Sequence, residues 1–142
     1  MNKRNILSNI YLADNLIKKK VRNGIGDNKL TPGVVNFLYF LSEHDGAIQK
    51  DISDHFREEP ASVTSTLKHM ERNGLIERRI NDSDSRAKCI YITSKGRSAQ
   101  ERVDDLYSSI QEEGLKGFSK EELDTLHVLI EKLCSNLERI EV

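Results

Sequence analysis

A stripe of short polar side chains in the middle of the chain has the chemistry needed to contact nucleic acid. Hydroxyl, methyl and ammonium groups can approach base edges and phosphate oxygens in the major groove of DNA. Val63, Leu67 and Met70 lie between these polar residues at spacings of three and four, which predicts a helix with one buried stripe. The other face of this helix supplies the predicted DNA contacts, which are Ala61, Ser62, Thr64, Ser65 and Lys68.

A second short helix is predicted directly before this one. Ile48, Ile52 and Phe56 recur every four residues and would line one helical face, and the polar residues 57–59 form a turn. Pro60 suits the first turn of the next helix, because proline lacks the amide hydrogen that a first turn leaves unpaired. Two helices joined by a short turn are the arrangement that places the second helix in a DNA groove.

A charged hairpin is predicted after the helix pair. Gly74 ends the second helix, and two strand-like runs at 75–80 and 87–93 are joined by the turn-forming residues 81–86. Helix, turn, helix and hairpin in this order predict a winged helix-turn-helix. The predicted fold class is therefore mainly α with a small β-hairpin wing.

Basic residues concentrate in the hairpin, although the chain as a whole is slightly acidic. Residues 68–97 contain eight Lys and Arg against four Asp and Glu, whereas the net charge of all 142 residues is −1. Phosphate neutralisation dominates DNA binding, so DNA is expected to lie against this segment. An arginine at a hairpin tip suits the narrow minor groove, which makes Arg86 the leading candidate. Arg78, Arg79 and Lys88 are the other predicted contacts, and only one of the adjacent pair Arg78 and Arg79 can face phosphate because they alternate sides.

Long amphipathic segments are predicted at both ends of the chain. Residues 5–22 place isoleucines and leucines on one wide face, and a capping box at Ser119 opens a last helix whose leucines follow the helical period to about residue 140. A further helix is expected from Ser94 to about residue 113. One small domain has no second layer to cover both apolar stripes. Burial in a two-fold homodimer and burial in the protomer's own core both stay open.

Length and composition agree with a single domain over residues 1–142. A DNA-binding lobe is predicted at about residues 30–97, with dimerisation helices at about 5–22 and 98–140. No apolar run approaches the roughly 18 residues of a membrane span, and the amphipathic start is unlike a secretory signal. A cytoplasmic protein that does not bind membranes is therefore expected.

Four short segments resemble the MarR (multiple antibiotic resistance regulator) family of winged helix-turn-helix transcription regulators. They are PASVT at 60–64, RNGLIER at 72–78, DSR at 84–86 and ITSKG at 92–96. Each is short, but together, in this order and spacing, they are specific, and the resemblance extends over about residues 5–140. The chain departs from the family at Arg57, where a turn glycine is usual, and at Ser65, where a base-reading arginine is common.

The resemblance implies a function and several residue roles. It implies a homodimer in which the first and last helices of both protomers intertwine, and which binds a palindromic operator in double-stranded DNA. It implies a transcription regulator, most often a repressor, that a small molecule or another signal releases from DNA. It also implies that Asp84 orients the Arg86 guanidinium through a charge-assisted pair, while a simple turn-forming role for Asp84 stays open.

A pocket for a small effector is expected between the first, second and fifth helices. Tyr11, Tyr39 and Phe40 are its candidate lining residues, although aromatic residues at helical spacing are more often part of a core. The resemblance favours a small, largely apolar and often anionic aromatic ligand in the cleft between the dimer base and the DNA-binding lobe.

Catalysis, a cofactor and a metal are not indicated by the sequence. No Ser, His and carboxylate pattern matches a catalytic motif, so an enzyme is not predicted. A metal site at Glu43, His44 and His127 is less favoured than ordinary surface or half-buried histidines. Cys134 is expected to be buried among leucines and Cys89 to be partly exposed, which leaves a thiol-based redox regulator open. A winged-helix module that binds a protein partner is a further alternative.

Overall fold

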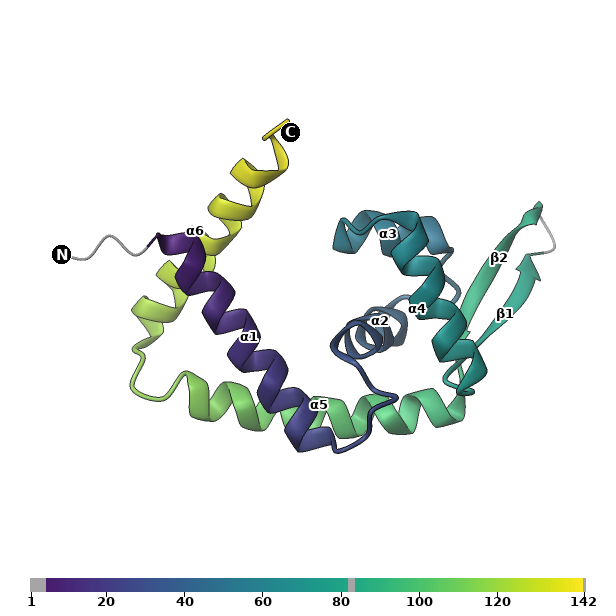
Figure 1. Cartoon of the computed structure of the whole chain (residues 1–142), viewed down its shortest axis with the longest axis horizontal. Coiled ribbons are helices and arrows are strands. Elements are labelled where there is room, and N and C mark those ends of the chain that lie inside the picture. The colour runs from purple at the N-terminus through teal and green to yellow at the C-terminus, as the bar shows by residue number, and fades with distance from the viewer. Residues whose placement is uncertain (1–4, 82–83, 142) are drawn as a thin grey trace. The chain divides into compact units, whose positions relative to one another are not determined.

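The computed structural model describes residues 5–81 and 84–141, and for residues 81 and 84–87 it describes the backbone alone. Its element order confirms the predicted winged helix-turn-helix (Figure 1). The elements are helices α1 (Ile6–Ile25), α2 (Pro32–Glu43), α3 (Gln49–Phe56) and α4 (Pro60–Arg72), strands β1 (Ile76–Asn81) and β2 (Asp84–Ile92), and helices α5 (Ser94–Gly114) and α6 (Lys120–Glu138).

The predicted helix starts are confirmed by their capping contacts. Thr31 precedes α2, and its hydroxyl accepts a hydrogen bond from the Val34 amide at 3.4 Å. The capping box of α6 is complete, because the Ser119 hydroxyl accepts from the Glu122 amide at 3.1 Å while the Glu122 carboxylate accepts from the Ser119 amide at 3.3 Å. These contacts satisfy amide groups that a helix start otherwise leaves unpaired.

Two predicted boundaries are wrong by about three residues. α1 continues to Ile25 instead of stopping near residue 22, and it ends where Gly26 takes a left-handed conformation with φ 62°. β2 begins at Asp84 instead of 87, because pairing with β1 continues past a register shift next to Ile80. The strands therefore extend into the residues that were predicted to form the turn.

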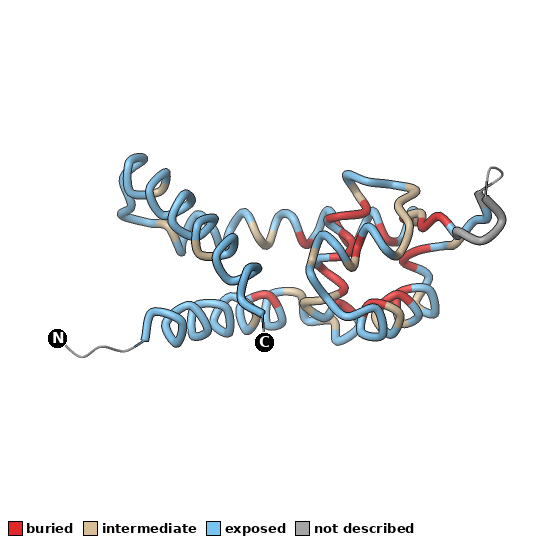
Figure 2. The backbone as a smooth tube through the Cα atoms, turned by 90° about the horizontal axis from the view of Figure 1, so that it is seen from above, coloured by how far each residue is buried: buried red, intermediate tan, exposed pale blue. Residues whose placement is uncertain are grey.

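The buried core lies among α2, α3, α4, the hairpin and the first half of α5 (Figure 2). Val63, Leu67 and Met70 are each 0% exposed, which confirms the predicted inward stripe of α4. By its internal contacts the chain divides after Ile110 into two compact units, and this core belongs to the first.

The apolar stripes of the two terminal helices are largely uncovered in the single chain. In α1 only Val21 is buried, and in α6 no residue is buried. The large exposed apolar side chains of these helices are Ile6, Leu7, Ile10, Tyr11, Leu12, Leu16 and Ile17 in α1, and Leu126, Val128, Leu129, Ile130 and Leu137 in α6. The protomer's own core therefore does not cover these stripes.

Both predictions about the cysteines are wrong. Cys134 is exposed, because α6 has no buried face in the single chain. Cys89 is buried, with 7% of its surface exposed, because the face of β2 on which it lies is also covered.

The turn between α3 and α4 holds a residue in a strained backbone conformation. Arg57 has φ 52° and ψ 43°, in the left-handed region that favours glycine. Its amide donates to the Ser53 carbonyl, and its side-chain Nη1 donates to the His55 carbonyl at 3.2 Å. The turn thus keeps the geometry of a glycine turn although the residue is arginine.

Within residues 5–81 and 84–141, no helix has both the length and the apolar character needed to cross a membrane.

Gly96 is required by a close approach between the first turn of α5 and Leu75, the residue before β1, and a substitution tests this packing. A β-carbon at Gly96 would lie 2.1 Å from the Leu75 carbonyl oxygen, so the backbone would have to shift. We expect Gly96→Ala to lower the free energy of unfolding by about 1–3 kcal/mol. Gly114→Ala in the same helix is the control, because its β-carbon meets no atom within 4 Å. Urea unfolding at one fixed protein concentration measures both variants, and equal stabilities would contradict the close approach.

Candidate nucleic-acid interface

A polar contact joins α3 to α4 beside their apolar faces. Gln49 Nε2 donates a hydrogen bond to Thr64 Oγ1 at 2.5 Å, and Thr64 Oγ1 donates to the Pro60 carbonyl oxygen at 2.8 Å. The Thr64 hydroxyl is thus engaged within the protein as donor and as acceptor. In the structure this hydroxyl links α3 to α4, and the DNA contact expected of Thr64 stays a prediction. Gln49 was missed because a contact between residues 15 apart leaves no local sequence pattern.

The remaining predicted residues of α4 lie on one exposed face. Ala61, Ser62, Ser65 and Lys68 are all exposed, and Arg72 in the last turn is exposed as well. Within the part of the chain that the structure describes, Lys68 and Arg72 form no ion pair or hydrogen bond through their side chains. The helix therefore presents small side chains in its first turns and two available cations further along.

The C-terminal end of α4 is held by residues from two other segments. His69 Nε2 lies 3.2 Å from the Lys29 carbonyl oxygen, in the loop before α2. Asn73 Nδ2 donates to the His69 carbonyl at 2.9 Å, and Lys95 Nζ of α5 donates to the Asn73 carbonyl at 2.8 Å. These contacts fix the end of α4 against the loop before α2 and against the first turn of α5.

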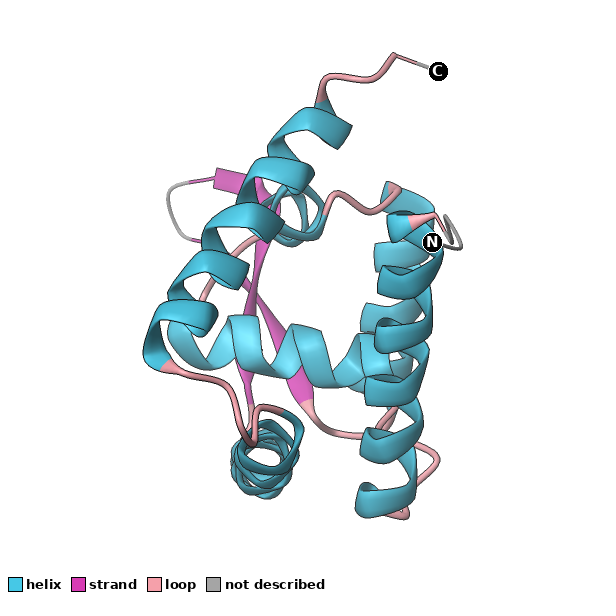
Figure 3. Cartoon of the chain, turned by 90° about the vertical axis from the view of Figure 1, so that its left-hand side faces the viewer, coloured by secondary structure: helices cyan, strands magenta, loops and turns pink. Residues whose placement is uncertain are grey.

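The two strands of the hairpin are drawn in magenta in Figure 3, and one face of this hairpin runs from the buried core to solvent. Ile76 pairs with Ile92, Arg78 with Ile90 and Ile80 with Lys88, so these side chains share one face. Exposure rises along β1, from 2% for Ile76 to 63% for Ile80. Between them Arg78 Nε donates to Glu71 Oε2 at 2.9 Å, which ties the hairpin to α4.

The outer face of the hairpin is covered by a cation and an aromatic ring. The Arg79 guanidinium carbon lies 4.4 Å from the centre of the Tyr91 ring, and Arg79 Nε donates to Glu77 Oε1 at 3.0 Å. This hydrogen bond raises the pKa of Arg79. Cys89 is paired with Arg79 on the same face and is buried, so it is not the accessible thiol that redox sensing requires.

The predicted hairpin contacts therefore differ in how available they are to DNA. Arg78 and Arg79 are each paired with a carboxylate, and the Arg78 side chain is only 22% exposed. Lys88 is exposed. The side chains of Asp84 and Arg86 lie outside the described residues, so their pairing stays a prediction.

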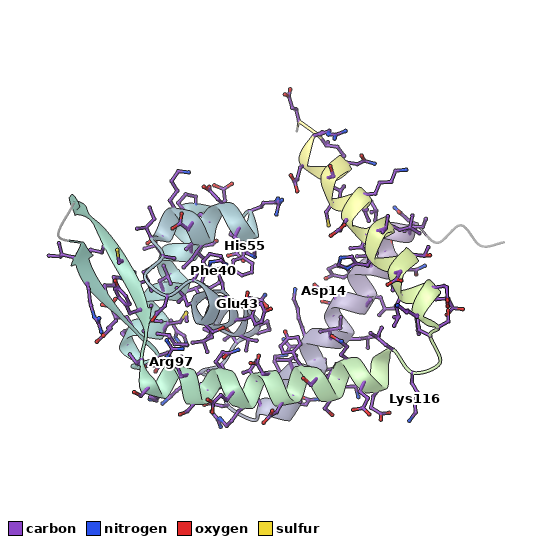
Figure 4. All side chains as sticks on the ribbon, turned by 180° about the vertical axis from the view of Figure 1, so that it is seen from behind. Asp14, Phe40, Glu43, His55, Arg97 and Lys116 are labelled. Carbon is purple, nitrogen blue, oxygen red and sulfur yellow. The ribbon has the colours of Figure 1, made fainter. Side chains whose placement is uncertain are left out.

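Asp45 attaches the base of the hairpin to the rest of the lobe. Its Oδ1 accepts from the Ile92 amide at 2.9 Å, and its Oδ2 accepts from Arg97 Nη2 at 3.1 Å. Arg97 lies where α5 meets the hairpin (Figure 4). The Gly46 amide donates to the Ile90 carbonyl, and the Ile90 amide donates to the Ala47 carbonyl, both at 2.8 Å. The sequence marked Asp45 only as the end of a helix, because its partners lie about 50 residues away.

The residues predicted to line an effector pocket do not share one environment. Tyr11 and Tyr39 are exposed, and Glu43 raises the pKa of Tyr39 by its charge and by a hydrogen bond. Phe40 is buried instead, and the centre of its ring lies 4.8 Å from the centre of the His55 ring (Figure 4). Phe56 packs on it from another side, with the ring centres 5.9 Å apart. Phe40 is therefore part of the aromatic packing between α2 and α3.

The histidines considered for a metal site have other neighbours. The ring centres of His44 and Phe40 lie 4.6 Å apart, and His127 Nε2 lies 3.1 Å from Glu131 Oε1 on α6. Among the described residues, no group of three or more His, Cys, Asp or Glu side chains is placed to hold a metal ion.

Two solved structures share this fold over nearly the whole chain. The crystal structure of the S. aureus MepR–DNA complex has a TM-score of 0.88 at 22% identity, covering 96% of this chain and 99% of that chain. The MarR protein from Peptoclostridium difficile DA00132 has a TM-score of 0.88 at 20% identity, covering 96% and 89%. Because both sequence identities are below 25%, the likeness to these two structures establishes the fold alone.

Sequence relatives establish the family. HTH-type transcriptional regulator BilQ of Clostridioides difficile (strain CD3) is 30% identical over 105 residues, which are 71% of this chain and 71% of that protein. Uncharacterized HTH-type transcriptional regulator YybA of Bacillus subtilis (strain 168) is 25% identical over 113 residues, which are 80% and 75%. Residues 30–88 match the model of the MarR family, a span that contains α2, α3, α4 and β1. The chain belongs to the MarR family.

Proposed function

We propose that this chain is a DNA-binding transcription regulator in which α4 enters a major groove and the hairpin contacts the adjacent minor groove. The exposed face of α4 is the observation that carries this proposal. Ala61, Ser62 and Ser65 are small enough for the helix backbone to approach base edges, and serine hydroxyls can both donate and accept hydrogen bonds. The S. aureus relative of the same fold was solved as a DNA complex, which supports this use of the fold.

The charges that meet the phosphates come from few residues. Lys68 and Arg72 on α4 and Lys88 on β2 are exposed, and we include Arg86 on the strength of the sequence. Arg78 joins the hairpin to α4 through Glu71 and Arg79 is paired with Glu77 within β1, so we assign both a smaller part in binding. Residues 68–97 contain eight Lys and Arg against four Asp and Glu, whereas residues 98–142 contain eleven Asp and Glu against five Lys and Arg. This asymmetry directs DNA to the DNA-binding lobe.

We further propose that the protein binds DNA as a homodimer. The lobe at about 30–97 reads DNA, and the helices at about 5–22 and 98–140 form the dimer. The exposed apolar stripes of α1 and α6 support this assignment, because water-exposed stripes of this length are typical of an interface. A two-fold dimer places its recognition helices about one DNA turn apart, roughly 34 Å, so the operator is palindromic.

The regulatory part of the proposal is a repressor that a small effector releases from its operator. Release requires that the effector bind one spacing of the two α4 helices better than another. Exposed Tyr11 and Tyr39 are retained as candidate contacts for the effector.

Lys68→Ala tests the phosphate contact of α4. We expect weaker binding to the operator and to random DNA by a similar factor, about 3- to 10-fold, and a shallower dependence of affinity on salt, because a phosphate contact reads charge and not sequence. Fluorescence anisotropy with both DNAs over a series of salt concentrations measures this. Lys116→Ala is the matched control, since Lys116 is exposed and paired with Glu113 outside the lobe. A loss confined to the operator would contradict the assigned role.

A double-mutant cycle on Gln49 and Thr64 tests their role in joining α3 to α4. Gln49→Ala and Thr64→Val are each expected to lower the free energy of unfolding by about 1 kcal/mol, and the double variant by less than the sum, because both remove the same hydrogen bond. Urea unfolding gives the three values. If Thr64→Val kept full stability and lost operator binding, the hydroxyl would instead be a DNA contact.

A glutamate in the apolar stripe of α6 tests the dimer. Leu126→Glu places a charge at the centre of this stripe, and we expect it to shift a dimer to monomer and to weaken operator binding at least 10-fold in consequence. Ser135→Glu adds the same charge on the opposite face of α6 by the helical period and should remain dimeric. Sedimentation equilibrium distinguishes the two. A wild-type monomer that bound the palindrome tightly would refute the proposed dimer. It would not contradict the proposed DNA contacts of the DNA-binding lobe.

A further inference from the structure

Two adjoining pockets lie beside the C-terminal end of α4, away from the proposed DNA contacts. The first encloses about 240 Å³ and the second about 120 Å³. Leu30 and Arg102 line both pockets, which makes the two neighbours. Neither pocket is lined by Tyr11, Tyr39 or Phe40, the candidate lining residues of the predicted effector pocket.

The first pocket combines an apolar floor with a positive rim. Leu30, Leu75 and Ala99 form the floor and are at most 4% exposed. Three cations, Lys29, Lys95 and Arg102, and a single carboxylate, Asp27, line the remainder. The charged side chains thus give the pocket an excess of two positive charges, which favours an anionic ligand.

The charged groups of this rim have donors available for a ligand. Within the described residues, the Arg102 guanidinium forms no hydrogen bond or ion pair. Lys95 Nζ uses one hydrogen bond on the Asn73 carbonyl and has three donors in all. One oxygen of the Asp27 carboxylate accepts from the Lys29 amide at 2.9 Å.

The side chains that line the second pocket are apolar apart from that of Arg102. Its walls are Ile25 at the end of α1, Leu30, and Val103 and Leu106 of α5, with Gly24 completing the lining. A β-carbon at Gly24 would lie 2.5 Å from a terminal methyl carbon of Leu106, so the Leu106 side chain lies close to the α1 backbone at this point. Apolar walls next to a positive rim suit a ligand with a charged head and a hydrocarbon body.

We propose that the two pockets together bind one amphipathic organic anion, an aliphatic carboxylate. Its carboxylate lies in the first pocket against Arg102, because a guanidinium fork matches a carboxylate through two parallel hydrogen bonds. Its hydrocarbon chain passes Leu30 into the second pocket, where burial of each methylene adds to affinity. Asn73 both lines the first pocket and ends α4, so the bound anion lies directly beside the end of that helix.

The test uses the full chain without DNA, so its outcome does not depend on the proposed DNA binding. Octanoate is titrated into 15N-labelled protein and followed by NMR. We expect the largest shifts at the Leu30 and Asn73 amides and at the Arg102 side-chain Nε–H. We expect Arg102→Gln to weaken octanoate binding about 10-fold or more, Arg102→Lys to retain part of the affinity, and Lys116→Gln to bind as wild type does.

Three ligand controls separate head from chain. Acetate and inorganic phosphate carry the charge without the hydrocarbon, and octylammonium carries the hydrocarbon with the opposite charge. Octanoate should bind at least 10-fold more tightly than each of them. Unchanged octanoate affinity in folded Arg102→Gln would overturn the site. If acetate or phosphate bound as tightly as octanoate, the site would be a simple anion site and the assignment of the second pocket would be overturned. If octylammonium bound as tightly as octanoate, the choice of an anion would be overturned.

Discussion

Asp45 lies in the turn between α2 and α3 and uses both carboxylate oxygens to hold later segments of the chain against it. One oxygen binds the last residue of β2 and the other binds Arg97 in the first turn of α5. A winged helix can present its recognition helix and its hairpin to DNA together only if the two keep a fixed spacing. The Asp45 contacts and the short bridge between Ala47 and Ile90 supply that rigidity at the base of the hairpin. Loss of the carboxylate would leave the Ile92 amide and the Arg97 guanidinium without these partners at once.

Two arginines of the hairpin have partners within the protein. Arg78 donates to Glu71 of α4, and Arg79 lies over Tyr91 and donates to Glu77, so both guanidinium groups are engaged within the protein. The residues left to meet phosphates are fewer than the sequence count of basic residues indicates. A modest positive surface gives DNA binding that depends on shape and base contacts more than on charge alone, and such a protein dissociates more readily from random DNA.

Local patterns predicted most of the fold, and distant contacts explain what they missed. The stripe of Val63 and Leu67 identified α4, and the capping residues Thr31 and Ser119 marked two helix starts. Alternation along a strand could not show that Cys89 is buried, because both faces of β2 are covered. In the candidate site, periodicity found the exposed face of α4. It could not show that Thr64 bonds to Gln49, since that pairing depends on how two helices pack.

The left-handed conformation of Arg57 affects how the chain tolerates mutation. A non-glycine residue in this region costs roughly 1–2 kcal/mol, and glycine at the same place relieves most of it. One substitution in the turn between α3 and α4 can therefore offset a destabilising change elsewhere, such as a new recognition residue on α4 that packs less well. A compensating glycine at Arg57 would therefore let the chain accept changes on α4 that would otherwise lower its stability.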